Sequence, residues 1–562
     1  MMLRPSVLSP CVRRNLIGIA LAMVAGFPLS AAGPRFFSDD PIAREPDPAD
    51  ASKVQSFSIH LSWDLISSLF IKEGDRAQVP SVNVNTLGEV PDSSWFTNRA
   101  GSRRLTDDEV ARGPDTTPGP AGDWTVVSGK SEGVRPGFTI RDTAGVRWFI
   151  KFDAPGYPEQ ATSAEVVSTK LFWALGYNVA ETHVATIRRQ ALHIAPDATI
   201  TVRGKRRRLT DDDVNRILAL VDEGPDHTYR AIASKAVEGK PVGEFLYYGT
   251  RADDPNDIYP HEDRRELRGM GAFAAWIDRV DAKAGNTIDT LVTEDGRTAV
   301  RHYVLDFGST LGSAGIGPNE PWEGYEYLYA GKPLLRKLLG FGFPVEYWRT
   351  IHYPSIRGVA RLEADHFDPT RWKSRVPNAA YIRAQPDDTF WAARKVTAIT
   401  DSQIAAAVKS GQYTDPEAVA YLTRTLIGRR DAIGRAFLQQ VNPIVAPALD
   451  EAGQLTFHNA AVEADVARAP TSYRVAWYRF DNATSESTAL GSAVEVPSTS
   501  AGAPPELPSD TGTYVRVDIA AADPARPAWA APVSTYFRRD TGRWVLVGLE
   551  HRSGVGSTSG TN

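Results

Sequence analysis

The alternation of apolar and polar positions between residues 123 and 176 predicts a strand pair followed by a helix. The stretch "WTVVSGKSEGVRPGFTIRDTAGVRWFIKFD" contains two β-rich runs separated by residues 142–145, a short glycine-containing turn of the kind that hairpins use. Lys151 lies near the end of the second run. In the next segment the apolar residues recur at roughly helical spacing: Val166, Leu171, Phe172 and Leu175. Gly176 then ends the predicted helix.

A second apolar helix leads into a polar loop and another predicted hairpin. The run "RRELRGMGAFAAWIDR" places its apolar residues on one helical face: Leu267, Met270, Phe273, Ala274 and Ile277. Asp281, Lys283 and Asn286 follow in the loop that leaves this helix. The next 22 or so residues form two strand-like runs joined by an Asp295-Gly296 turn. Asn286 at the start of the hairpin and Asp306 at its exit are therefore expected at the same end.

Helix starts are marked by threonines that are followed by acidic or amide residues. Thr106 and Thr210 each precede a run of acids, which can satisfy free N–H groups and the helix dipole. Thr400 and Gln403 have the spacing of a capping box. We expect a helix to begin after each of the three threonines.

The remaining regions differ in composition and pattern. Residues 33–122 form an N-terminal extension that begins with a segment rich in Pro, Asp and Ser, and residues 190–230 resemble an insertion. Residues 325–440 are expected to be mostly helical. Strand-like runs in 450–551 are separated by Pro, Gly and Ser clusters at sandwich-like intervals, which predicts an all-β, immunoglobulin-like sandwich. The Gly- and Ser-rich residues 552–562 are predicted to be a flexible tail.

Composition is that of an ordinary globular protein and argues against nucleic-acid binding. The chain has 562 residues, of which 42% are hydrophobic and 23% charged, with a formal net charge of -5. The one dense basic run, residues 205–208, is followed at once by the three acids of 211–213. No basic field is available to hold a phosphate backbone, so no nucleic-acid partner is expected.

The first 32 residues have the features of a signal peptide. Arginines precede the apolar run 16–25, and small residues at 30–32 suit cleavage after Ala32. A retained membrane anchor is the alternative, but Pro28 interrupts a segment that is already short for a span. Cys11, the only cysteine, precedes the apolar run, so the mature chain would have no thiol for a disulfide, metal site or nucleophile. We expect an exported protein, periplasmic or secreted, without a membrane span after signal removal.

The polar loop and the second hairpin have the arrangement that a magnesium-held triphosphate requires. Mg²⁺ prefers oxygen ligands and keeps several waters, so Asn286 and Asp306 suffice beside substrate phosphates. Asp281 would then accept or orient the proton of an attacking hydroxyl, and Lys283 would offset charge on the moving phosphoryl group. The alternative is a polar loop capped by its own Asx turns.

A phosphate-binding lysine is available upstream. Lys151 on its strand could bind the α- and β-phosphates, with Glu165 on the following helix positioning it as an ion pair. Glu159 competes with Glu165 for this role, and Glu165 could instead be an ordinary solvated helix residue. Lys151 could also be an edge lysine that only keeps its charged end in water.

With these features in this order, the chain resembles the protein-kinase-like superfamily. The matching features are Lys151, Glu165, the loop 281–286 and Asp306-Phe307-Gly308. The resemblance implies an α+β, two-lobed kinase-like fold over about residues 123–445, with ATP between a small β lobe and a larger helical lobe. The predicted sandwich follows this domain.

Several departures from the family pattern indicate an atypical branch. Arg279-Val280 precede Asp281 where the family has His-Arg, and no Ala-Pro-Glu follows Gly308. Gly129 and Gly133 are the candidate nucleotide-binding glycines of a shortened glycine-rich loop, although any tight turn would use glycines too. In these motifs the chain resembles lipid, HipA-like, spore-coat or secretory-pathway kinases more than ordinary Ser/Thr kinases.

The sequence therefore predicts an exported kinase-like phosphotransferase that moves the γ-phosphoryl group of ATP to a hydroxyl acceptor. Mg²⁺ or Mn²⁺ is the expected metal, and the acceptor is an unidentified protein or small molecule. An exported bacterial-type protein meets little ATP, which leaves two alternatives open. The same residues could transfer an adenylyl group, or the chain could be an inactive scaffold that binds a surface partner through its C-terminal sandwich.

Overall fold

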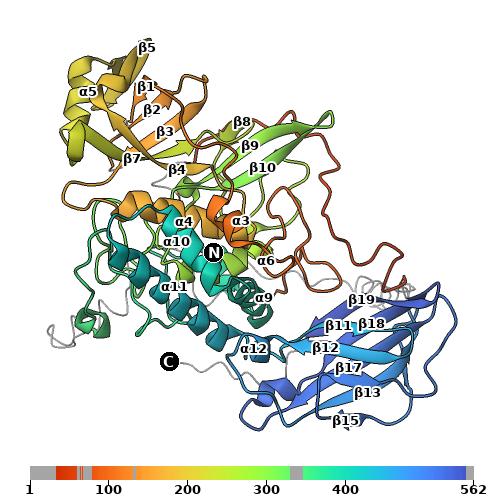
Figure 1. Ribbon diagram of the computed structural model, residues 1–562. Coiled ribbons are helices and arrows are strands. Elements are labelled where there is room, and N and C mark those ends of the chain that lie inside the picture. The colour runs from red at the N-terminus through yellow and green to blue at the C-terminus, as the bar shows by residue number, and fades with distance from the viewer. Residues whose placement is uncertain are drawn as a thin grey trace, which may run out of the picture.

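The computed structural model describes most of the chain (Figure 1). The described residues are 33–59, 64, 66, 67, 79–130, 135–328 and 346–551. The predicted signal peptide (1–32), Gly133 and the predicted tail (552–562) lie outside the described residues. Within the described ranges, every helix is too short or too polar to cross a membrane.

A seven-stranded sheet with the order β4-β7-β3-β2-β1-β5-β6 forms the β lobe. Its strands are β1 Trp124–Gly129, β2 Gly137–Arg141, β3 Arg147–Phe152, β4 Thr182–Arg188, β5 Leu192–Val202, β6 Lys205–Arg208 and β7 Thr228–Lys235. The predicted hairpin is confirmed, since β2 and β3 are antiparallel neighbours with Gly137 opposite Lys151. Segment 190–230 supplies β5, β6 and helix α5 (Asp211–Leu218) to this lobe, and β5 runs parallel to β1.

Helix α4 (Gln160–Leu175) packs against β3, β4 and β7 on one side and against helices of the larger lobe on the other. All of its residues except Trp173 are buried. The carboxylate of Asp153 accepts three backbone N–H groups at its N-terminus, at 2.8, 3.0 and 2.8 Å. Gly176 ends the helix as predicted, at φ 124°, where an added Cβ would lie 2.3 Å from the ring of Phe96.

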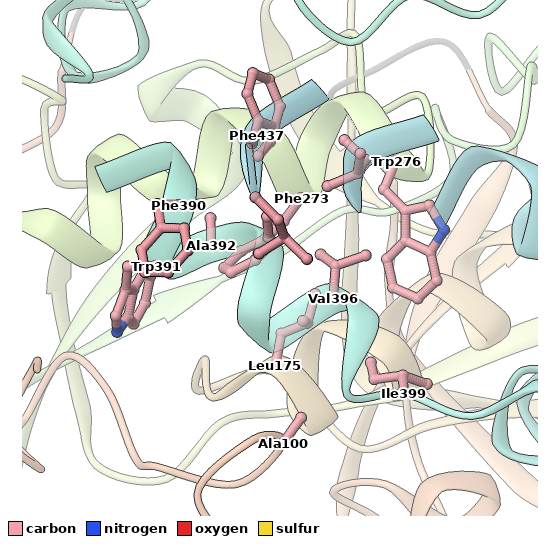
Figure 2. Close-up of a cluster of buried hydrophobic side chains, with 14 of the residues drawn as sticks. Ala100, Leu175, Phe273, Trp276, Phe390, Trp391, Ala392, Val396, Ile399 and Phe437 are labelled. Carbon is pink, nitrogen blue, oxygen red and sulfur yellow. The ribbon is translucent and has the colours of Figure 1, made fainter. Parts of the chain in front are cut away.

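The larger lobe contains most of the helices and contributes to one apolar core. Its helices are α3 Asp107–Arg112, α6 Arg265–Trp276, α8 Ala379–Arg383, α9 Pro386–Thr397, α10 Asp401–Ser410 and α11 Pro416–Phe437. The prediction of a mostly helical segment 325–440 is wrong in its first part, because the described residues 325–328 and 346–378 contain no α-helix and the helices begin at Ala379. Figure 2 shows side chains of α6, α9 and α11, among them Phe273, Trp391 and Phe437, in the same apolar cluster as Leu175 of α4. Because α4 contributes to this core, the position of α4 is tied to the helical lobe.

Local capping follows the predicted signals. Thr106, Thr210 and Thr400 each accept the backbone N–H of the residue three positions on, at the starts of α3, α5 and α10. Short 3₁₀ turns connect other elements: η1 Arg189–Ala191, η2 Pro225–His227, η3 His261–Asp263, η4 Ala284–Asn286, η5 Tyr347–Thr350 and η6 Pro527–Ala530. The three predicted helix starts are therefore confirmed.

The second predicted hairpin is also confirmed. Strands β9 (Thr287–Glu294) and β10 (Arg297–Val304) pair antiparallel, and β8 (Lys240–Gly243) adds to the β9 edge. Asp295 and Gly296 both have positive φ, 51° and 76°, as a two-residue hairpin turn requires. Thr287 lies opposite Val304, so the residues just before β9 and just after β10 emerge at one end.

Residues 444–551 form an all-β region with one short helix, α12 (Ala460–Glu463), and the turn η6. One sheet has the order β11-β12-β16, and a larger one has β14-β13-β17-β18-β19, with β15 also paired to β13. Their strands are β11 Ile444–Leu449, β12 Gln454–Asn459, β13 Ser472–Phe480, β14 Ser487–Ala489, β15 Val494–Val496, β16 Ser500–Gly502, β17 Tyr514–Ala522, β18 Val533–Asp540 and β19 Arg543–His551. The predicted strand-rich C-terminal region is confirmed, and its immunoglobulin-like topology stays a prediction.

Residues 33–59, called the N-terminal strap below, contact both this β region and the three-stranded sheet β10-β9-β8. At one end Phe36 is buried against Phe480 and Tyr536, and its backbone exchanges two 2.8 Å hydrogen bonds with the side chain of Asn482. At the other end the backbone N–H of Phe57 donates to Val242 of β8 at 3.2 Å. The strap thus contacts two parts of the fold that are far apart in sequence.

Candidate functional site

Lys151, Glu165 and Asp306 meet where the β lobe faces the helical lobe. Lys151 Nζ on β3 lies 2.7 Å from Glu165 Oε1 on α4 and 3.0 Å from Asp306 Oδ1, which follows β10. The Glu165 side chain is 4% exposed and the Lys151 side chain 12% exposed. Three residues from three separate elements therefore form one charged cluster.

Glu165 and not Glu159 is the partner of Lys151. Glu159 precedes α4, where its carboxylate accepts hydrogen bonds from Thr414 at 2.6 and 2.8 Å and from Arg357 at 3.2 Å. Those contacts attach the start of α4 to the segment before α11. The structure decides the competition that the sequence left open, because Glu165 reaches Lys151 from within α4, whereas Glu159 precedes the helix and binds Thr414 and Arg357.

Asp306 sits in a strained backbone position and leaves part of its carboxylate accessible. Its φ is 54°, in the left-handed region that a non-glycine residue rarely adopts, and its side chain is 47% exposed. The next residue, Phe307, is buried against Phe172 of α4 with ring centroids 4.9 Å apart. Partial burial acts to raise the pKa of Asp306, but the charges of Lys151 and Arg135 outweigh it and hold the pKa well below its usual range. Asp306 is therefore an ionised oxygen donor.

Asn286 is a neighbour of Asp306 through the backbone of the hairpin. The backbone N–H of Leu305, directly before Asp306, donates to the carbonyl oxygen of Asn286 at 2.9 Å. The Asn286 side-chain amide donates to the backbone carbonyl and carboxylate of Asp281, at 2.7 and 3.1 Å. Both of these bonds use Nδ2, so the acceptor oxygen Oδ1 is the atom that suits a cation.

Asp281 lies in a loop held by two cations. Its carboxylate is 3.0 Å from Lys283 Nζ and 3.3 Å from Arg375 Nη1, and the side chain is 16% exposed. Burial acts to raise the pKa of Asp281, but Lys283 and Arg375 outweigh it and lower the pKa below its ordinary value. Arg375 is fixed in turn by Glu323 at 2.6 Å. Asp281 is consequently ionised at neutral pH, as a proton acceptor must be.

The oxygen donors fit a divalent ion that also binds substrate. In the described ranges, no three His, Asp or Glu side chains gather in a way that could hold a metal ion. Asp306 and Asn286 offer one carboxylate and one amide oxygen, which is the small set that Mg²⁺ uses when phosphates and water complete its shell. The donor chemistry thus suits Mg²⁺ or Mn²⁺ together with a phosphorylated ligand and would not retain the ion strongly alone.

Gly129, one of the candidate nucleotide-binding glycines, has a packing reason to be glycine. It ends β1, opposite Phe138, and an added Cβ would lie 2.8 Å from the Ile200 side chain on β5. Gly133 lies outside the described residues. A tight strand contact therefore accounts for Gly129 without a ligand.

Two arginines that pair with the predicted carboxylates, Arg135 and Arg375, were not predicted from the sequence. Arg135 lies directly before Pro136-Gly137 and pairs with Glu165, and its Nη2 is 3.7 Å from Asp306 Oδ1. Arg375 comes from a loop almost 90 residues beyond the Asp281 loop. The nearness of Arg135 to the glycine loop was an available signal, whereas no local pattern marks Arg375.

Comparisons with known proteins give only distant structural likeness. No family model matches the chain, and no curated protein sequence does. A crystal structure of the Golgi casein kinase aligns at 11% identity over 71% of this chain and 95% of that chain, with a TM-score of 0.29. A crystal structure of the same kinase with Mn/ADP bound aligns at 10% identity over 70% of this chain and 94% of that chain, with a TM-score of 0.29. A crystal structure of the Helicobacter pylori proinflammatory kinase CtkA aligns at 14% identity over 54% of this chain and 93% of that chain, with a TM-score of 0.27. At these TM-scores the likeness defines neither the fold nor the function of this chain.

Proposed function

We propose that this chain is an ATP-dependent, kinase-like phosphotransferase of an atypical kind, which moves a γ-phosphoryl group to a hydroxyl acceptor. The observation that supports it best is the meeting of Lys151 with Glu165 and Asp306, at 2.7 and 3.0 Å. Phosphoryl transfer depends on positioning and on charge stabilisation, and this cluster combines a fixed cation with a carboxylate that is accessible to a metal.

The nucleotide side of the site is assigned to four residues. Lys151, oriented by Glu165, binds phosphate oxygens, and Asn286 Oδ1 with Asp306 would hold Mg²⁺ or Mn²⁺. A bound divalent ion supplies positive charge to the phosphates during transfer. Phosphate oxygens of a bound nucleotide would pair with Lys151, and the carboxylate of Asp306 would then be available to the ion.

The acceptor side is assigned to Asp281 and Lys283. An acceptor hydroxyl oxygen forms a bond to the γ-phosphorus, the bond from that phosphorus to the bridging oxygen breaks, and ADP leaves with that oxygen. The hydroxyl proton passes to the ionised carboxylate of Asp281. Lys283, 3.0 Å from that carboxylate, stabilises negative charge on the group being transferred.

The test is label transfer by the purified chain with Mg²⁺ or Mn²⁺. Wild type is incubated with γ-labelled or α-labelled ATP and compared with Asp306→Ala and Asp281→Asn. Asp212→Asn, an exposed residue of α5, is the matched control. We expect γ-label on an acceptor or on the protein itself for wild type and Asp212→Asn, and its loss in both site variants.

Two other results would replace the proposal. Transfer of α-label that depends on the same residues would assign adenylyl transfer. No transfer, together with no nucleotide-induced rise in melting temperature, would leave a non-catalytic scaffold whose C-terminal β region binds a partner.

We also propose that the enzyme is exported, on the basis of residues 1–32. Basic residues, an apolar run and the small residues before Gly33 form the pattern of a cleaved signal peptide. N-terminal sequencing of the mature protein tests this assignment. A mature chain beginning at Gly33 supports export, whereas an intact N-terminus in the cytoplasmic fraction contradicts it.

A further inference from the structure

Arg135 is a buried cation whose hydrogen-bonding capacity is only partly used. Its side chain is 5% exposed, its Nη2 pairs with Glu165, and the same nitrogen lies 3.7 Å from Asp306 Oδ1. The second terminal nitrogen, Nη1, is buried and has no hydrogen-bond partner among the described residues. A buried guanidinium nitrogen without a partner is costly, so an acceptor that completes it would bind with a gain in free energy.

The guanidinium group lies against the backbone that follows Asp306. An added Cβ at Gly308 would lie 2.5 Å from Arg135 Nη2, 2.7 Å from Cζ and 3.0 Å from Nη1. Gly308 therefore provides the space that Arg135 occupies. Both terminal nitrogens of Arg135 therefore lie against the backbone that follows Asp306, and Nη2 is the one near the Asp306 carboxylate.

Three cations and three carboxylates interact around Arg135. The cations are Lys130, Arg135 and Lys151, and the carboxylates are Glu165, Asp306 and Asp153. Burial, followed by repulsion from Lys151 and Arg135, lowers the pKa of Lys130 to about 8. The three cations repel one another, and a multiply charged anion bound among them would relieve that repulsion.

We propose that Arg135 is a phosphate-binding residue that makes the site select for the length of a nucleotide's phosphate chain. The inference rests on the proposed function and adds a second cation to Lys151 for the same ligand. An arginine fork can donate two parallel hydrogen bonds to phosphate oxygens, which a lysine cannot. Glu165 holds both cations in place before the ligand arrives, so little ordering is needed on binding.

The alternative is that Arg135 only orients Glu165 and, through it, Lys151. The two roles predict different effects of replacing Arg135 in a protein that also carries Lys151→Met. A residue that acts through Lys151 loses its effect on phosphate binding when Lys151 is absent, whereas a residue that touches phosphate keeps it.

The experiment is calorimetric titration with ATP, ADP, adenosine and inorganic tripolyphosphate, each with Mg²⁺. Wild type, Arg135→Gln and Arg135→Lys are compared, each also with Lys151→Met. Arg216→Gln, an exposed arginine of α5 whose side chain is 66% exposed, is the matched control. We expect Arg135→Gln to weaken the binding of ATP and of tripolyphosphate about 10- to 100-fold, to weaken the binding of ADP less, and to leave the binding of adenosine unchanged. The loss persists with Lys151→Met, and Arg135→Lys recovers part of it.

Each other outcome is decisive. An equal loss for ATP and adenosine, or a loss that disappears with Lys151→Met, overturns the inference and leaves the proposed function intact. Tripolyphosphate binding that needs Arg135, without ATP binding, supports a phosphate-binding Arg135 and overturns the proposed function. Should Arg135→Gln not fold, the ratio of ATP to adenosine affinity in Arg135→Lys decides. A ratio equal to that of wild type overturns the inference.

Discussion

Replacing Gly308 by alanine tests how Arg135 is held in this structure. The new Cβ would lie 2.5 Å from Arg135 Nη2, closer than side-chain carbons approach other atoms in folded proteins. The Gly308 backbone follows Phe307, which is buried against α4, so the backbone is the less mobile partner. Arg135 is therefore expected to move, and its ion pair with Glu165 to break.

The magnitude follows from the burial of the pair that breaks. Arg135 and Glu165 are 5% and 4% exposed, and a hydrogen bond between charged groups contributes about 1.5–3 kcal/mol. Removing one partner of a buried pair costs about 3–5 kcal/mol when the other charge is left alone. Here Glu165 keeps Lys151 at 2.7 Å, so the lower range applies. We expect Gly308→Ala to reduce the local free energy of unfolding by about 2 kcal/mol.

Native-state hydrogen exchange is the suitable assay, because a chain with several folded regions does not unfold in one step. Amides of α4 and β3 report on the site, and amides of β13 in the C-terminal region serve as an internal reference. Gly502→Ala is the matched control, since an added Cβ there meets nothing within 4 Å. Faster exchange is expected in α4 and β3 for Gly308→Ala and in neither for Gly502→Ala.

A double-mutant cycle gives the result that would refute this reasoning. With Arg135→Ala the guanidinium is gone, so adding Gly308→Ala should cost less than about 0.5 kcal/mol. If Gly308→Ala costs the same with and without Arg135, the strain lies in the backbone after Asp306 and the contact with Arg135 is not its cause.

Three further predictions concern pH and the N-terminal strap. Because the pKa of Lys130 is lowered to about 8, we expect Lys130 to take up a proton when a polyphosphate binds, and the affinity for ATP to fall as the pH rises above about 8. Calorimetry in buffers of different ionisation enthalpy measures this proton uptake, and Lys130→Met should abolish it. Burial acts to raise the pKa of Glu181, but hydrogen bonds, first among them that from Lys235, lower it to about 2. The stability that Glu181 contributes is therefore present above about pH 4.5 and lost as the pH falls toward 2. Glu181→Gln should make the fall in melting temperature over this pH range less steep. An unchanged slope contradicts the assignment. Phe36→Ala removes a buried ring from the strap contact, at a cost of about 3–5 kcal/mol, and speeds limited proteolysis within residues 33–59. Phe37→Ala, at a position that is 58% exposed, leaves the cleavage rate unchanged.

The sequence alone determined the elements whose signals are local. The turns at 142–145 and Asp295-Gly296, the end of α4 at Gly176 and the threonine caps such as Thr400 depend on a few adjacent residues and matched the structure. The order of Lys151, Glu165 and the two hairpins also indicated which side chains meet. Local backbone preference and alternating hydrophobicity are sufficient for such elements because each acts over one turn or one strand.

Only the tertiary structure decided which charges complete the site. Arg135, in the segment just before β2, pairs with Glu165 on α4, and Arg375 pairs with Asp281 from a position 94 residues later in the chain. The choice of Glu165 over Glu159 likewise depended on the orientation of a helix that is buried on nearly all sides. These contacts join segments far apart in the chain, and the energies that select them are packing and charge pairing in three dimensions. A linear pattern of residues does not contain that information, since many other pairings would be equally compatible with it.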